Sequence, residues 1–181
     1  QEEIDNYAFE GTPIQPNAKP GDFKFEDVDN NGIIDAKDRV FLGSALPTYM
    51  IGFNTTFEYK GIDFSIDLYA QGGNKIYNAK RAQRLGNENY DLDFYENRWH
   101  GEGTSNSYPS ADLTGENMNP NSWYIEDGSF IRIRNIQIGY TIPVKVATTL
   151  GVRSVRFYAN TSNPFTFFKY NGFTPEIASS S

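Results

Sequence analysis

Residues 49–71, which read YMIGFNTTFEYKGIDFSIDLYAQ, decide the fold. Apolar side chains recur at alternate positions from Tyr49 to Tyr59, and polar side chains fill most positions between them. Lys60-Gly61 is a turn signal, after which the alternation resumes and runs from Ile62 to Ala70. Alternation with a period of two is typical of a half-buried strand, and a tight turn between two such stretches predicts a hairpin. The sequence therefore predicts a long antiparallel hairpin with one apolar and one polar face.

The apolar face of this hairpin has two possible neighbours. In a soluble β-sandwich it would pack on a second sheet, whereas in an outer-membrane barrel it would contact lipid and the polar face would line a water-filled lumen. Tyr49 and Tyr59 stand near opposite ends of one strand, where aromatic girdles lie at the membrane interfaces. We expect an all-β fold in either case.

Two further strands are predicted in residues 130–162. Apolar positions change parity near Arg134-Asn135, which indicates a bulge or a strand whose outer half stands above a membrane. Pro143 ends the third strand, residues 144–151 suit one or two helical turns, and the fourth strand follows at residues 155–160. Asn163-Pro164 then opens a loop that we expect to occupy residues 163–181.

Residues 27–38, DVDNNGIIDAKD, match a twelve-residue calcium loop. Gly32 falls at the sixth position, where the sharp turn needs a residue without a Cβ, and Asp38 replaces the usual Glu at the twelfth. An acidic surface turn uses the same residue types. Because spacing and glycine agree, we expect a metal site for Ca²⁺ rather than Mg²⁺, with ligands Asp27, Asp29, Asn31, Ile33 through its carbonyl, Asp35 and Asp38.

The composition excludes several classes of protein. A net charge of −7 argues against nucleic acid as a partner, and the absence of cysteine removes thiol chemistry. No apolar run is long enough for a membrane-spanning helix. Both ends of the 181 residues fall in polar sequence, with no initiating methionine, so we expect a piece of a longer protein.

Residues 72–129 form a long polar segment with scattered aromatic residues, and long segments of this kind are usually functional. Trp99, Trp123 and Tyr124 are the candidates for substrate contact, and packing of the loops is the alternative role for them. His100 is the only histidine, and no nucleophile with a base partner is visible. We therefore expect a protein that is not an enzyme.

Four blocks resemble SusC/RagA-type TonB-dependent outer-membrane transporters, in the order found near the C-terminus of that family. They are DFKFEDVDNNGIIDAKDRVFLG, GFNTTFEYKGIDFSIDLYAQG, DGSFIRIRNIQIGYTIP and VRFYANTSNPFTFFKYNGFTPEI. The resemblance implies antiparallel strands of a transmembrane β-barrel with about 22 strands. It also implies import of glycans, oligosaccharides or peptides across the outer membrane of Bacteroidetes, under a SusD-like surface lipoprotein and with energy from TonB.

Loop lengths add a topology to this resemblance. Short turns follow residues 49–59 and 131–142, as periplasmic turns do, whereas residues 1–48, 72–129 and 163–181 are long, as extracellular loops are. The metal loop would then brace an extracellular segment. No plug or TonB-contacting segment is recognisable, and we expect the final barrel strand of the family to be missing after Ile177. The alternative is a soluble, calcium-stabilised β-sandwich that binds carbohydrate.

Overall fold

A computed structural model describes residues 2–82, 89, 91–112 and 115–176 of the chain. The chain forms two compact units. The loop unit comprises residues 1–42 and 78–124, and the sheet unit comprises residues 43–77 and 125–181.

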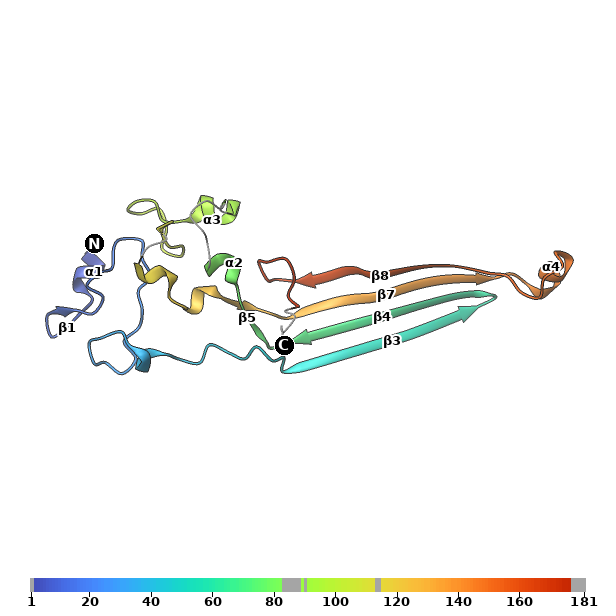
Figure 1. Cartoon of the computed structure of the whole chain (residues 1–181), viewed down its shortest axis with the longest axis horizontal. Helices are drawn as coiled ribbons and strands as arrows, with labels where there is room; N and C mark the ends of the chain where they lie inside the picture. The colour runs from blue at the N-terminus through green and yellow to red at the C-terminus, as the bar shows by residue number, and fades with distance from the viewer. Residues whose placement is uncertain (1, 83–88, 90, 113–114, 177–181) are drawn as a thin grey trace. The chain divides into compact units, whose positions relative to one another are not determined.

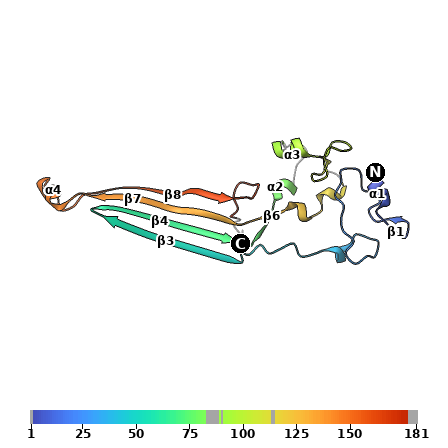
Figure 2. The ribbon, with the colours of Figure 1, turned by 180° about the vertical axis from the view of Figure 1, so that it is seen from behind.

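The sheet unit is built on one four-stranded antiparallel sheet (Figure 1). Its strands are β3 (Tyr49–Tyr59), β4 (Ile62–Gly72), β7 (Phe130–Thr141) and β8 (Arg156–Phe168), in the order β3-β4-β7-β8. The same four strands run side by side when seen from behind (Figure 2). The predicted antiparallel β-fold is therefore confirmed, and the sheet has two open edges, so the described residues do not close a barrel by themselves.

The β3–β4 hairpin forms as predicted. Tyr59 pairs with Ile62, which leaves Lys60 and Gly61 as a two-residue turn. Their φ angles are 48° and 85°. Positive φ at both central residues is the geometry whose twist matches that of the flanking strands, and glycine at the second position adopts it without a steric cost.

A bulge in β7 explains the change of parity near Arg134-Asn135. Asn135 pairs with Asp67 of β4 and Ile133 pairs with Leu68, so Arg134 is the extra residue of β7. One extra residue reverses the side-chain alternation, and the isoleucines of β7 on both sides of Arg134 therefore reach the same face. The guanidinium of Arg134 lies 4.0 Å from the ring centroid of Tyr69.

The strand β8 extends beyond residue 162, where the sequence predicted the end of the strands. The prediction of a loop from residue 163 is therefore wrong for residues 163–168. The strand runs through Asn163 and Pro164 to Phe168. These two residues lie between the pairs Asn135↔Ser162 and Ile133↔Phe165, opposite the bulge. Proline is tolerated where a bulge already interrupts the ladder, so Asn163-Pro164 distorts the strand without ending it.

Smaller elements complete the sheet unit. The helix α4 (Val144–Thr149) connects β7 to β8 after Pro143 and buries Ala147 completely. The strands β5 (Lys75–Tyr77) and β6 (Ile125–Asp127) pair antiparallel around Ile76, which is 2% exposed. Residues 177–181 of the predicted last loop lie outside the described residues.

The described residues of the loop unit form only short elements. They are α1 (Glu2–Asn6), β1 (Ala8–Phe9), β2 (Thr12–Pro13), η1 (Ala36–Asp38), α2 (Ala79–Ala82), α3 (Leu92–Asn97), η2 (Gly115–Met118) and η3 (Ser122–Tyr124). Ring contacts hold the unit together in an aromatic cluster of Phe23, Phe94, Tyr108, Trp123 and Tyr124. Within the part of the chain described, no helix is both long and apolar enough to cross a membrane.

Candidate functional site

Three of the predicted metal ligands come together in the loop of residues 27–38. Carboxylate oxygens of Asp27, Asp29 and Asp38 all lie within 4.8 Å of one another. Lys37 is the basic side chain that neighbours this group, with Nζ 3.9 Å from Asp29 Oδ2. Three carboxylates beside one ammonium leave an excess of negative charge, and hard oxygen donors are the ligands that Ca²⁺ prefers.

Backbone N–H groups hold two of these carboxylates in place. Asp27 accepts from the N–H groups of Asn31 and Gly32, at 3.0 and 2.8 Å. Asp38 accepts from the N–H groups of Asp35 and Val28, at 2.6 and 2.8 Å. The bond from Asp35 is the largest cause of a lowered pKa of the Asp38 carboxyl. The loop thus favours the ionised carboxylate that a cation needs.

The other predicted ligands make contacts within the loop. Asp35 caps the helix η1, since its Oδ1 accepts from Lys37 N at 2.7 Å. Asn31 donates from Nδ2 to Asp29 Oδ2 at 3.0 Å and accepts from the N–H of Ile33 at 2.9 Å. Asn31 therefore lies beside the carboxylate group, whereas the Asp35 side chain is engaged in capping.

Gly32 is required in this loop for two reasons. Its φ is +82°, a conformation that residues with a side chain rarely adopt. A Cβ at this position would also lie 2.7 Å from Cδ1 of Phe9. The glycine therefore lets the turn at the sixth position of the metal loop lie directly against the Phe9 ring.

The predicted substrate-contacting aromatic residues separate into two environments. Trp123 and Tyr124 belong to the aromatic cluster, with ring centroids 5.3 Å apart, and Tyr124 is 5% exposed. The Tyr124 hydroxyl donates to the Asn117 carbonyl at 2.6 Å. These two residues pack the loops against one another. Trp99 instead lines a pocket of the loop unit.

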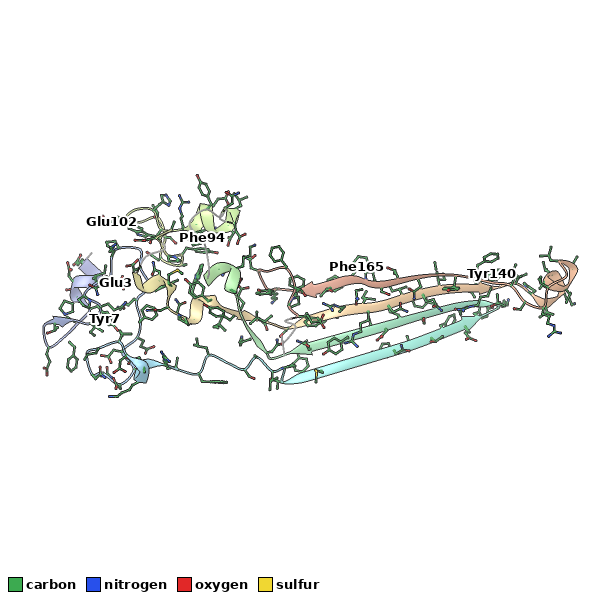
Figure 3. All side chains as sticks on the ribbon, viewed as in Figure 1. Glu3, Tyr7, Phe94, Glu102, Tyr140 and Phe165 are labelled. Atoms are coloured by element: carbon green, nitrogen blue, oxygen red, sulfur yellow. The ribbon has the colours of Figure 1, made fainter. Side chains whose placement is uncertain are left out.

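The main sheet has an apolar face that β3, β4, β7 and β8 share, because directly paired residues lie on the same face. Figure 3 shows Tyr140 of β7 and Phe165 of β8 projecting from the sheet. The large side chains of this face are Tyr49, Ile51, Phe53, Phe57, Tyr59, Ile62, Phe64, Ile66, Leu68, Ile131, Ile133, Ile136, Ile138, Tyr140, Phe157, Phe165 and Phe167. Many of them are exposed, for example Phe53 at 55% and Phe157 at 64%.

The opposite, polar face carries an ion pair that crosses a strand. Arg156 of β8 donates from Nε and Nη2 to the two carboxylate oxygens of Asp63 on β4, at 3.1 and 2.5 Å. Gly139 of β7 pairs with both Asp63 and Tyr158. A Cβ on Gly139 would lie 2.4 Å from Asp63 Oδ1, so the missing side chain makes room for the pair. This contact was not predicted from the sequence, where its one signal is a glycine at a polar-face position of a strand.

No family model matches the chain. Curated relatives do match it over nearly its whole length. A TonB-dependent receptor of Formosa agariphila, P26, is 33% identical over an alignment of 181 positions that covers 97% of this chain. The TonB-dependent receptor SusC of Bacteroides thetaiotaomicron is 31% identical over 165 residues, or 90% of this chain. The chain is homologous to part of a TonB-dependent receptor. It spans 18% and 16% of the length of these two relatives.

Solved structures agree with the fold. The RagAB peptide importer in its 'open-open' state matches with a TM-score of 0.65 and 21% identity, over 83% of this chain and 17% of that chain. Its 'closed-closed' state matches with a TM-score of 0.63 and 22% identity, over 82% and 17%. The described residues therefore share the antiparallel fold of the matching part of these importers. These relatives are receptors and importers, in agreement with the expectation that the chain is not an enzyme.

Proposed function

We propose that this chain is a membrane-spanning segment, with its outer loops, of a TonB-dependent transporter in the bacterial outer membrane. The observation that supports this proposal most strongly is the apolar face shared by all four strands. The bulge at Arg134 keeps this face continuous. The strands are 11, 11, 12 and 13 residues long. A transmembrane strand needs about 9–11 residues, so each of them is long enough to cross the hydrocarbon core.

The name of one structural relative bears on the cargo. RagAB is a peptide importer, and SusC is a TonB-dependent receptor. We propose that the whole protein imports oligosaccharides, glycans or peptides under a SusD-like lipoprotein, with TonB acting through another part of the chain. The soluble β-sandwich is not favoured, because within the described residues no second sheet covers the exposed Phe53 and Phe157.

The lipid-facing orientation is tested by arginine substitutions in the full-length transporter. Phe53→Arg and Ile136→Arg place a charge on the apolar face near the middle of β3 and β7. We expect each to destabilise the protein folded in the membrane by about 2–4 kcal/mol. Asn54→Arg and Gln137→Arg are matched controls, one residue along each strand on the polar face. The measurement is the fraction of folded protein in the outer membrane. Equal assembly of the two pairs would refute the orientation.

We further propose that residues 27–38 bind Ca²⁺ and brace an extracellular loop. Asp27, Asp29 and Asp38 would supply carboxylate oxygens, Asn31 and Asp35 side-chain oxygens, and Ile33 its carbonyl. A bound ion stabilises the folded loop by mass action and neutralises the carboxylate group. The support is the gathering of three carboxylates beside a single lysine.

The calcium proposal is tested with a double variant, Asp27→Ala with Asp29→Ala. In the parent protein, we expect Ca²⁺ to slow proteolysis of the loop unit relative to a chelator. The double variant should lose this difference in proteolysis. Asp5→Asn removes a carboxylate elsewhere in the loop unit and should keep the difference. A calcium effect of the same size in the double variant would exclude these residues as ligands.

A further inference from the structure

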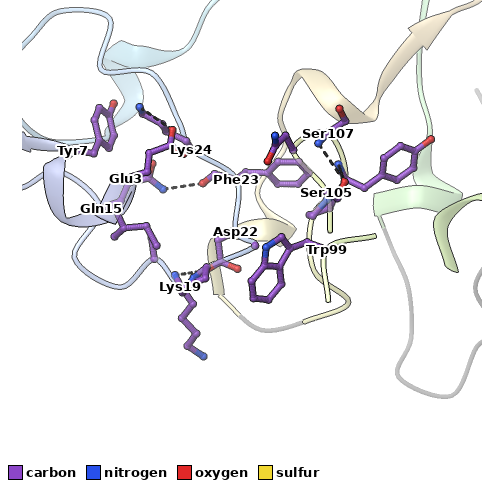
Figure 4. A pocket seen from close by; sticks show the side chains of 17 residues that line it. Glu3, Tyr7, Gln15, Lys19, Asp22, Phe23, Lys24, Trp99, Ser105 and Ser107 are labelled. Carbon is purple, nitrogen blue, oxygen red and sulfur yellow. Dashed lines mark hydrogen bonds and ion pairs between the residues drawn. The ribbon is translucent and has the colours of Figure 1, made fainter. Parts of the chain in front are cut away.

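A pocket in the loop unit has no role in the function described so far. It has a volume of about 480 Å³, within the range of small-molecule sites, and lies between residues 15–24 and the loop of residues 99–109 (Figure 4). We propose that this pocket binds a neutral oligosaccharide. The assignment names the class of cargo for the proposed import function and rests on that function.

An indole ring forms a fixed wall of the pocket. Trp99 lies against the backbone of Gly21, since a Cβ on Gly21 would come within 2.5 Å of Trp99 Cε3. Two backbone bonds hold this contact: Ser110 N donates to Gly21 O at 2.8 Å, and Trp99 N donates to Pro109 O at 3.2 Å. A rigid aromatic surface binds a ligand at a small cost in side-chain entropy, and the apolar face of a sugar ring can stack on it.

The charged groups of the pocket are already paired. Lys24 Nζ lies 3.5 Å from Glu3, and Lys19 Nζ lies 3.6 Å from Asp112. Asp22 accepts from Lys19 N and from Asn117 Nδ2, both at 2.8 Å. A cationic or anionic ligand would have to compete with these partners, whereas a neutral ligand would not.

Neutral hydrogen-bonding groups remain available. Within the residues that the structure describes, no hydrogen-bond partner is found for the indole N–H of Trp99, the side-chain amide of Asn106 or the hydroxyl of Ser107, and all three residues line the pocket. Gln15 differs, because both ends of its amide are used to hold Phe23 and Phe25. Neutral donors and acceptors beside an aromatic face match the alternating hydroxyl and C–H surfaces of a sugar.

Binding is tested on the full-length transporter in detergent by native mass spectrometry. The probes are neutral oligosaccharides from hydrolysed starch, xylan and mannan, with a tryptic digest of casein as the peptide comparison. We expect sugar adducts with the parent protein and adducts that are about tenfold weaker with Trp99→Ala. Trp99→Phe keeps a ring against Gly21 without the N–H, and Ser107→Ala changes only an exposed hydroxyl; both should weaken binding to a smaller extent. Tyr95→Ala removes an exposed aromatic ring outside the pocket and is the matched control.

Three results would overturn the pocket assignment: no sugar adduct, adducts from casein peptides alone, or sugar adducts that Trp99→Ala leaves unchanged. The same preparation separates this failure from failure of the transport proposal. Protein that is assembled in the outer membrane but binds no sugar overturns only the pocket. Protein that is absent from the outer membrane overturns the proposed function.

Discussion

Replacing Gly21 by alanine tests the contact that fixes Trp99. Gly21 has a φ of +91°, and its missing Cβ leaves room for the indole ring. Gly11 is a matched control, because its φ is +81° and nothing lies within 4 Å of the position of a Cβ. Both alanine variants carry the cost of a positive φ, about 1–2 kcal/mol. Only Gly21→Ala must also displace a large and rigid ring.

The expected difference between the two variants follows from this steric term. Overpacking of a close contact typically costs about 1–3 kcal/mol, and each 1.4 kcal/mol is a factor of ten in an opening equilibrium. Tryptic cleavage after Arg98 reports opening next to Trp99, and its rate follows the open population when closing is fast. We expect cleavage at Arg98 to be about tenfold faster, or more, in Gly21→Ala than in Gly11→Ala.

The reasoning would be refuted by equal cleavage rates at Arg98 in the two variants. That result would mean that the indole moves aside freely and that the Gly21 backbone does not position it. If cleavage were faster in both variants than in the parent protein, but equally fast in the two, the effect would come only from the cost of the positive φ. The pocket would then lack its fixed wall.

Two further predictions concern single contacts. Gly139→Ala should destabilise the detergent-solubilised transporter by about 1–3 kcal/mol in unfolding titrations, because its Cβ would strike the Asp63 carboxylate, whereas Gly52→Ala in β3 points into open space and should cost little. A cost at Gly52 equal to that at Gly139 would contradict this. The Tyr108 hydroxyl donates to Asp93 at 2.8 Å, which raises the pKa of Tyr108, so its stabilisation is complete below the ordinary pKa of tyrosine and is lost as pH rises through the folded-state pKa. Asp93→Asn should lower the pKa of Tyr108. The measurement is a pH titration of tyrosinate absorbance, in which the signal of Tyr108 is the part that Tyr108→Phe removes. An unchanged titration midpoint in Asp93→Asn would show that Asp93 does not raise the pKa of Tyr108.

Local patterns in the sequence predicted the sheet well. The Lys60-Gly61 turn and the alternation around it determine the hairpin, because register and facing residues follow from a two-residue turn. The reversal of parity near Arg134 indicated either a bulge or a strand whose outer half stands above a membrane, and the pairing with β4 identifies the bulge. These features are predictable because each depends on neighbours within a few residues of the chain.

Features that depend on partners far along the chain were not predictable. Asn163-Pro164 has the composition of a loop, and only the bulge on the neighbouring strand makes it part of β8. The Asp63 and Arg156 side chains are 93 positions apart and meet across Gly139. Likewise, sequence could not separate Trp99 from Trp123, since their environments are set by contacts with Gly21 and with the aromatic cluster.

In the metal loop, spacing and structure agree in part. The sequence assigned six ligands from the loop pattern, and the structure gathers the carboxylates of Asp27, Asp29 and Asp38. The spacing fixes which residues can reach a common centre. It does not fix whether a side chain such as Asp35 instead satisfies a nearby backbone N–H, because a helix start within the loop competes for it.

The bulge in β7 has a consequence for counting barrel strands from sequence. Before Arg134 the isoleucines of this strand have odd numbers, and after it they have even numbers. A search for strict alternation over all 12 residues of β7 would find isoleucines at odd positions in one half and at even positions in the other. The two signals would cancel and no strand would be assigned, although the large aliphatic side chains share one face. Barrels whose strands carry such insertions will therefore be assigned too few strands, unless the search allows the phase to change once within a strand.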